Sequence, residues 1–251
     1  MYQQKKYIQF LIKSTNQHGV HSPFIFDVIT KCFYNKTNYT DYQELKAYRN
    51  ALLKNKETIL ITDLGSGSKK TNKTERRISE LARTAGTPLK RAQLGYRFTQ
   101  YFKPEHILEL GTSLGIATQA MHLGHPKTQI TTIEGCSNVS KFTQAALTNY
   151  KNIQFLTGDF SKHLKNVNQQ SWDCIFFDGN HTKQATLNYF ETLLPAAHND
   201  TIFIFDDIYW SKEAWEIIKQ HPQVTATIDT FFWGFVFFRK EQGKEHFTIR
   251  V

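Results

Sequence analysis

Cysteine is scarce in this sequence. The chain has 251 residues and three cysteines, Cys32, Cys136 and Cys174, an odd number with no CxxC pair among them. This usage argues against a disulfide framework and against a cysteine-based zinc site. It favours a protein of the reducing cytoplasm.

Long apolar runs are missing as well. No run approaches the roughly 20 residues that a membrane span needs. The apolar stretch at 7–12 is too short for a signal peptide, and no small-residue cleavage site follows it. With 40% hydrophobic and 21% charged residues, the sequence predicts an ordinary globular protein without a membrane span. The length suits one large domain, or a smaller domain with an extra segment.

Acidic residues are few in the first part of the chain. Residues 1–103 hold 19 basic and 7 acidic residues, whereas 104–251 hold 12 and 15, and the whole chain has a net charge of +9. A basic front part attracts an anionic substrate, nucleic acid or a membrane surface. A solvated basic face that only keeps the protein soluble explains the same charge equally well.

From residue 104 onward, short apolar runs alternate with amphipathic stretches. The expected strands are 106–110, 129–134, 153–157, 172–178, 201–207, 224–230 and 233–239. The expected helices lie near 115–124, 137–149, 182–194 and 211–221. This alternation predicts a parallel sheet with helices on both faces. The last two strands are joined by too few residues for a crossover, so we expect five parallel strands followed by an antiparallel hairpin.

Residues 1–103 lack this alternation. They are predicted to be mostly helical, with polar loops at 35–41 and 68–75. One strand-like run at 58–62 is followed directly by DLGSGS (63–68). We interpret 1–103 as a cap that covers the substrate, and 104–251 as the core domain.

Two glycine loops are candidates for a nucleotide-like ligand. The loop at 61–70 is followed by a helical pattern without an acid-ended strand, which favours a simple turn. The loop ILELGTSLGIATQA (107–120) follows a strand and precedes a helix, and the next strand ends in Glu134, 23 residues after Gly111. That spacing suits a carboxylate that accepts both ribose hydroxyls. The GxxxG spacing and the neighbouring Glu109 disfavour a pyrophosphate and favour a cationic or amine-bearing ligand.

Five segments together resemble class I S-adenosylmethionine-dependent methyltransferases, in particular the metal-dependent O-methyltransferases of the catechol O-methyltransferase type. They are ELGTSLG (109–115), TIEG (132–135), TGDF (157–160), FFDGNH (176–181) and FDDIYW (205–210). The resemblance implies a Rossmann-like methyltransferase sheet and covers more than half of the chain. The segments HGVHSPF (18–24) and DLGSGS lie outside the common pattern and indicate a distinct bacterial branch.

The resemblance also implies which residues bind S-adenosylmethionine. Asp159 would contact the adenine amine, and Glu109 with Gly111 the methionine end. Thr87 lies where related enzymes also touch the cofactor. Further contacts are implied for Thr112, Ser113, Gly135 and Asp178.

Acidic residues follow two neighbouring predicted strands. Asp178 ends the fourth strand, and Asp206 and Asp207 end the fifth. Carboxylates that converge on one sheet edge repel one another unless a cation lies among them, and oxygen ligands favour Mg²⁺, with Mn²⁺ or Ca²⁺ as options. The family uses two Asp and one Asn, so Asp207 is a departure that either changes metal preference or caps the next helix. The alternative is a purely structural role, in which these acids only end strands and cap helices.

His181 stands where the related family has a lysine that accepts the substrate proton. A neutral imidazole performs this step near pH 7, with Asp178 beside it. A helix-capping or surface role is the alternative, and for His18 and His21 a structural role is favoured. Tyr209 and Trp210 either wall an aromatic substrate or belong to the core.

The sequence therefore predicts metal-assisted O-methylation of a small-molecule hydroxyl. One rival is an RNA methyltransferase that grips RNA with the basic front part, although no catalytic signature of that class is present. The other is a protein that binds S-adenosylmethionine without catalysis. The acceptor and the oligomeric state stay open, with a homodimer as one option.

Overall fold

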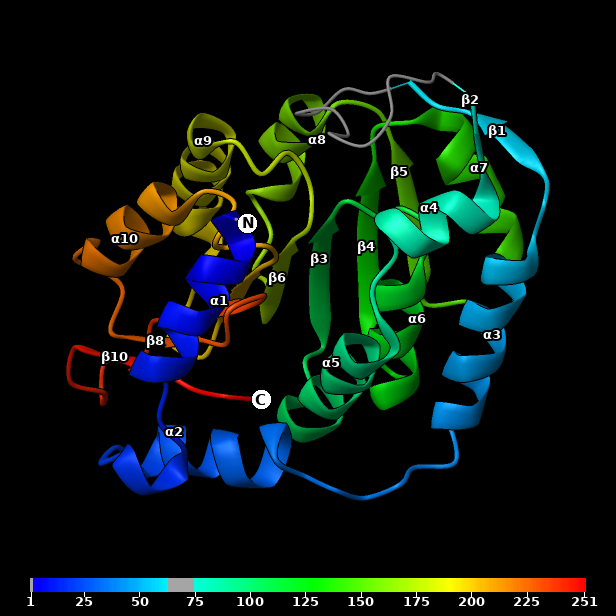
Figure 1. The fold of residues 1–251 in the computed structure, drawn as a ribbon. Helices are drawn as coiled ribbons and strands as arrows, with labels where there is room; N and C mark the ends of the chain where they lie inside the picture. The colour runs from blue at the N-terminus through cyan, green and yellow to red at the C-terminus, as the bar shows by residue number, and fades with distance from the viewer. Residues whose placement is uncertain (1, 63–74) are drawn as a thin grey trace. The chain divides into compact units, whose positions relative to one another are not determined.

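The computed structural model describes residues 2–62 and 75–251. The glycine loop at 63–68 therefore lies outside the described residues, and so does nearly all of the predicted polar loop at 68–75. The chain divides into two compact units, one of Met1–Tyr34 with Leu164–Val251 and the other of Asn35–His163. Figure 1 shows the ribbon coloured along the chain, with most helices and strands labelled. The division into a cap of 1–103 and a core of 104–251 stays a prediction.

The unit of Asn35–His163 holds three parallel strands, a separate two-stranded antiparallel sheet and helices. Its elements are α3 (Tyr42–Lys54), β1 (Thr58–Leu60), β2 (Glu75–Arg77), α4 (Ile78–Thr84), α5 (Leu89–Phe102), β3 (His106–Leu110), α6 (Ile116–Gly124), β4 (Gln129–Glu134), α7 (Ser137–Ala146) and β5 (Ile153–Thr157). β3 pairs with β4 and β4 with β5, all in parallel. The predicted strands 106–110, 129–134 and 153–157 are confirmed at both ends.

Buried apolar side chains explain why these strands form. Ile107, Leu108 and Leu110 of β3 and Ile133 of β4 are fully buried. Such continuous apolar runs are typical of parallel strands covered on both faces. A separate core cluster joins α3 to α6, with Leu45 and Ala120 among its fully buried members. The residues before β3 thus share a core with the helix that follows it.

The unit of Met1–Tyr34 and Leu164–Val251 combines both ends of the chain. Its elements are α1 (Tyr2–Lys13), the 3-10 turn Gln17–Gly19, α2 (Pro23–Asp27), the π-helix Val28–Phe33, β6 (Cys174–Phe177), α9 (Lys183–Leu193), the 3-10 turn Leu194–Ala196, β7 (Ile202–Phe205), α10 (Lys212–Gln220), β8 (Ala226–Asp229), β9 (Gly234–Phe237) and β10 (Glu245–Thr248). α8 (Phe160–Val167) runs across the division between the units.

Strand pairing in this unit confirms the predicted hairpin. β6 and β7 are parallel, and β8 and β9 are antiparallel partners. β9 also pairs antiparallel with β7. β10 was not predicted and lies parallel to β8. The α/β fold class, with mainly parallel strands and a C-terminal antiparallel hairpin, is confirmed.

The segment HGVHSPF starts a helix. The Ser22 hydroxyl accepts a hydrogen bond from the Ile25 N–H at 3.2 Å and donates one to Gln242 Oε1 at 2.6 Å. Pro23 occupies the first helical position, where its missing N–H costs nothing. This motif therefore has a structural role, as a capped start of α2 that is tied to the loop before β10.

Among residues 2–62 and 75–251, every helix is too short or too polar to cross a bilayer.

Candidate functional site

The loop after β3 is shaped by three residues with left-handed backbone. Gly111, Ser113 and Gly115 have φ angles of 106°, 47° and 71°. The Gly111 N–H donates to the Ile133 carbonyl at 2.9 Å, which holds the loop against β4. A Cβ on Gly115 would lie 2.6 Å from Thr143 Cγ2. The predicted close packing at the start of α6 is therefore present, and a side chain at Gly115 would push α7 away.

Glu134 joins this loop to the start of α7. Its Oε2 accepts a hydrogen bond from the Ser113 N–H at 2.8 Å, and its Oε1 accepts one from the Cys136 N–H at 2.9 Å. Burial raises the pKa of the Glu134 carboxyl, and these backbone donors oppose that rise. A carboxylate offers about four lone pairs, and the backbone donors are Ser113, Cys136 and Gly135, so the carboxylate keeps capacity for a ligand hydroxyl.

Glu109 is fully buried at 0% exposure, in the strand that leads into the loop. Its Oε2 accepts hydrogen bonds from the Thr118 and Thr132 hydroxyls, both at 2.6 Å. Its buried Oε1 has no hydrogen-bond partner in the part of the chain that the structure describes. An orphaned acceptor of this kind is costly, and a ligand amine would satisfy it. The loop thus fits a cofactor with a cationic or amine-bearing end.

The pKa of Glu109 predicts an unusual pH dependence of stability. Burial raises this pKa from 4.5 to about 7, because desolvation disfavours the charged carboxylate. Between these two pH values the folded state binds more protons than the unfolded state. The free energy of unfolding therefore falls as pH rises through this window, by about 3 kcal/mol in all, and levels off above it.

Glu109→Gln should remove this fall, as measured by denaturant unfolding between pH 4.5 and 8. Glu105→Gln is the matched control, since Glu105 lies exposed just before the same strand and should leave the pH slope as in the wild type. An unchanged slope in Glu109→Gln would show that Glu109 does not titrate in this window.

The other predicted cofactor residues of this unit lie at loops and strand ends. Asp159 comes just before α8, and its Oδ1 accepts a hydrogen bond from the Ser161 N–H at 2.8 Å. The Ser161 contacts lower the pKa of the Asp159 carboxyl. Thr87 is buried, and its carbonyl accepts a hydrogen bond from Arg49 Nε at 3.2 Å. Gly135 follows Glu134 directly. Their roles in binding a cofactor stay predictions.

Thr112, Thr118 and Thr132 form a buried hydroxyl network around Glu109. The Thr112 and Thr132 hydroxyls are 2.6 Å apart. Because Thr132 donates its proton to Glu109, Thr112 is the donor in this pair. Of the three, only Thr112 was predicted from the sequence. Thr132 lies in a strand that is mostly polar and Thr118 lies in α6, so neither stands out in the local pattern.

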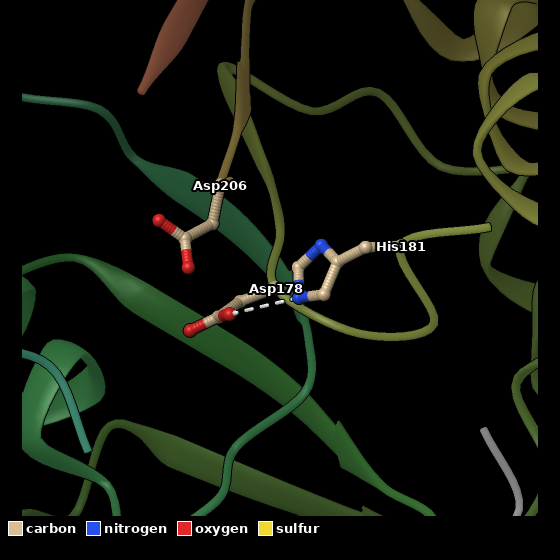
Figure 2. Close-up of side chains that lie close together, drawn as sticks. All are labelled: Asp178, His181 and Asp206. Carbon is tan, nitrogen blue, oxygen red and sulfur yellow. Dashed lines mark ion pairs between the residues drawn. The ribbon is translucent and has the colours of Figure 1, made fainter. Parts of the chain in front are cut away.

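In the other unit, three side chains come together. Asp178, His181 and Asp206 each offer a ligand atom, and these atoms all lie within 4.8 Å of one another. Figure 2 shows the imidazole of His181 turned toward the Asp178 carboxylate, with the Asp206 carboxylate beside them. His181 Nε2 lies 3.8 Å from Asp178 Oδ1, and these side chains are 25% and 18% exposed.

The register of β6 and β7 brings the two acids together. Phe177 pairs with Phe205, so the residues that follow them, Asp178 and Asp206, leave the sheet side by side. The Asp206 N–H donates to the Phe177 carbonyl at 2.9 Å and extends the ladder by one residue. The predicted convergence of Asp178 and Asp206 at one sheet edge is thus present in the structure.

Asp207 is not a member of this group of three. It has left-handed backbone, with a φ of 49°, and its carbonyl accepts a hydrogen bond from the Trp210 N–H at 2.7 Å. The turn sends the chain away directly after Asp206. The structure therefore groups His181, and not Asp207, with the two predicted carboxylate ligands.

The donor set fits a divalent cation. A small cavity of about 10 Å³ beside the cluster is lined by His181, Asp206 and Asp207 together with apolar side chains, and Asp178 is not among its lining residues. The fit to a cation therefore rests on the three clustered ligand atoms. Two carboxylates favour a hard ion such as Mg²⁺, whereas an imidazole as third ligand shifts the preference toward Mn²⁺.

Of the other candidate residues in this unit, Tyr209 belongs to an aromatic cluster. Its ring lies 4.4 Å from that of Phe231, and its hydroxyl donates to Asp229 Oδ2 at 3.0 Å. Trp210 is 38% exposed. His18 and His21 are exposed, and His18 lies 3.2 Å from the Gln17 side chain.

Residues 108–208 match a protein family described as a methyltransferase domain. The match spans less than half of the chain. The matched residues begin in β3 and end just after β7, so the matched stretch contains Glu109, Glu134 and all three members of the Asp178–His181–Asp206 cluster.

Solved structures share the fold. A methyltransferase from Podospora anserina, bound to S-adenosylhomocysteine (SAH), is 14% identical with a TM-score of 0.61, covering 88% of this chain and 97% of its own. An O-methyltransferase from Bacillus cereus in complex with SAH is 16% identical with a TM-score of 0.54, covering 83% and 95%. The O-methyltransferase TomG from Streptomyces achromogenes, in complex with S-adenosylmethionine, is 14% identical with a TM-score of 0.55, covering 62% and 82%. The Rossmann-like methyltransferase fold is thereby confirmed. Among curated proteins, none matches this chain.

Proposed function

We propose that the protein transfers a methyl group from S-adenosylmethionine to a hydroxyl oxygen of a small molecule, assisted by a divalent cation. The observation that carries the proposal is the Asp178–His181–Asp206 cluster at the ends of β6 and β7. It places two carboxylates and one proton acceptor together, which is what deprotonation of a hydroxyl requires. The methyltransferase-domain match and the SAH-bound and S-adenosylmethionine-bound relatives in fold support the donor.

The loop after β3 and the end of β4 would hold S-adenosylmethionine. Glu134 would accept hydrogen bonds from the ribose hydroxyls while Ser113 and Cys136 keep its carboxylate in place. Glu109 would meet the amine of the methionine end with its orphaned Oε1. Asp159 would accept from the adenine amine. Thr87, Gly111, Thr112, Gly135 and Asp178 complete the proposed contacts.

The cluster would prepare the acceptor. When bound, S-adenosylmethionine supplies an electrophilic methyl group, and a divalent cation supplies positive charge that lowers the pKa of a nearby hydroxyl. Asp178 and Asp206 would hold the cation, with Asp207 as a further candidate. His181 would accept the hydroxyl proton at Nε2, and Asp178, 3.8 Å away, stabilises the imidazolium that results. Alignment of the two reactants supplies much of the rate enhancement.

Calorimetry and a product assay test this function. We expect S-adenosylmethionine to bind the full chain, and SAH to form with a panel of phenols and sugar alcohols, faster with Mg²⁺ or Mn²⁺ than with a chelator. Binding without turnover on broad panels would point to a non-catalytic binding protein. Salt-dependent turnover on RNA alone would point to an RNA methyltransferase.

A further inference from the structure

A second, larger cavity lies in the unit of Met1–Tyr34 and Leu164–Val251, with a volume of about 430 Å³. Its walls come from α1, from Tyr209 and the length of α10, and from the ends of β8 and β10. Its charged lining residues are Lys6, Lys13, Lys212, Lys219, Glu216 and Asp229. Four ammonium groups thus face two carboxylates, which leaves an excess of two positive charges.

The two acids of this cavity are already engaged by its own residues. Glu216 binds Lys212 Nζ at 3.2 Å and Lys219 Nζ at 2.9 Å, one with each oxygen. Asp229, 6% exposed, accepts from Lys212 Nζ at 3.2 Å and from the Tyr209 hydroxyl. Its other oxygen accepts from the Phe231 N–H at 2.8 Å. Neither carboxylate is therefore placed to hold a cation from solution.

The excess charge comes from α1. Lys6, Phe10 and Lys13 are spaced at i, i+4 and i+7, so they share one face of this helix. Phe10 is buried at 3% exposure and anchors that face. The sequence of α1 contains no acidic residue. The helix thus brings two lysines, and no counter-charge of its own, to the mouth of the cavity.

The chemistry of the lining distinguishes between classes of anion. All four cations of the lining are lysines, and none is an arginine. Arginine matches planar carboxylates in a bidentate manner, whereas lysine ammonium groups act as point charges that suit a tetrahedral phosphate. A phosphomonoester carries about −1.5 to −2 charges near pH 7, which complements the excess of two.

The cavity is too large for a phosphate alone. Phe10 and Tyr209 are also lining residues, with ring centroids 6.3 Å apart in an edge-to-face arrangement. Phe10 is only 3% exposed, so the ring that a ligand can reach is that of the partly exposed Tyr209. A volume of several hundred Å³ is typical of sites for small organic ligands. An apolar or aromatic ligand body would lie beside Tyr209, while its anionic end meets the lysines.

We propose that this lysine-lined cavity binds a small organic phosphate. It is distinct from the Asp178–His181–Asp206 cluster, because α10 presents Lys212, Glu216 and Lys219 to it, and Trp215 and Ile218 to the small cavity beside Asp206. The proposal therefore does not rest on methyl transfer.

Phenyl phosphate is the probe, titrated into the full chain by calorimetry at constant ionic strength in chloride buffer, with benzoate as the carboxylate comparison. We expect phenyl phosphate to bind at least about tenfold more tightly than benzoate. The double substitution Lys6→Gln and Lys13→Gln should weaken phenyl phosphate binding about tenfold or more. The matched control is Lys5→Gln with Lys240→Gln, which removes the same charge from exposed positions outside the cavity and should keep affinity within about twofold.

Equal weakening in both double variants would reveal unspecific attraction to a basic surface and overturn the proposal. Equal or tighter binding of benzoate, or no binding of phenyl phosphate to the wild type, would overturn it too. S-adenosylmethionine affinity, measured on the same samples, should be the same in all variants. It reports on the proposed function separately from this cavity.

Discussion

Replacing Asp206 with asparagine is expected to lower metal-stimulated turnover on the order of 100-fold, because a bound cation contributes several kcal/mol to the stabilisation of developing negative charge. Asparagine is close in size but carries no charge, so it holds a cation more weakly. The Asp206 N–H bond to the Phe177 carbonyl is a backbone contact and survives the change. We therefore expect the fold to persist.

The measurement is kcat/KM against Mg²⁺ and Mn²⁺ concentration, together with S-adenosylmethionine affinity by calorimetry. Affinity for the donor should stay within about twofold, since Asp206 is not among its proposed ligands. Asp200→Asn is the matched control. It removes the same charge from the same unit, at an exposed residue paired with Arg239, and should leave both quantities near the wild-type values. Loss of turnover and of donor affinity together in Asp206→Asn would mean that Asp206 is structural.

Two further substitutions separate the members of the site. If Asp178, His181 and Asp206 are all the protein ligands of the cation, Asp207→Asn should keep kcat/KM and donor affinity near the wild-type values, as Asp200→Asn should. A loss of metal-stimulated turnover as large as that of Asp206→Asn would show that Asp207 is a metal ligand. His181→Gln distinguishes base from ligand, because a base lowers kcat without changing metal affinity, whereas a lost ligand weakens metal affinity as well.

The sequence predicts best where a local pattern and the tertiary packing agree. β3 and β4 match their predicted bounds because their aliphatic and β-branched residues end at Gly111 and at the pair Glu134–Gly135. The convergence of Asp178 and Asp206 followed from a single rule, that parallel strands open on the same edge. The choice between Asp206 and Asp207 did not follow, because it depends on the left-handed turn at Asp207.

Two elements were missed for different reasons. α8 is amphipathic, with Phe160, Leu164 and Val167 at helical spacing, but it is only eight residues long and lies between two predicted strands. β10 (Glu245–Thr248) alternates poorly and exists because it pairs with β8, about 20 residues earlier. The packing of α1 beside residues of α10, at the other end of the chain, leaves no trace in local sequence. The lysine-lined cavity was therefore beyond the reach of sequence analysis.

Glu134→Gln is expected to weaken S-adenosylmethionine binding by about 100-fold, because each hydrogen bond to a charged group contributes about 1.5–3 kcal/mol. The amide NH₂ of glutamine would also face the N–H of either Ser113 or Cys136, two donors in contact. Calorimetry with S-adenosylmethionine measures the loss. Glu105→Gln is the matched control, an exposed glutamate in the same unit, and should bind as the wild type does.

Ribose recognition and support of the loop predict different results with cofactor analogues. If Glu134 accepts the ribose hydroxyls, SAH analogues that lack one hydroxyl should bind the wild type about tenfold more weakly than SAH. In Glu134→Gln, the same analogues and SAH should then bind with nearly equal affinity, because the partner of that hydroxyl is already lost. If Glu134 only holds Ser113 and Cys136 in place, the penalty for the missing hydroxyl should be the same in both proteins. That equality would refute the ribose role and move the donor away from the end of β4.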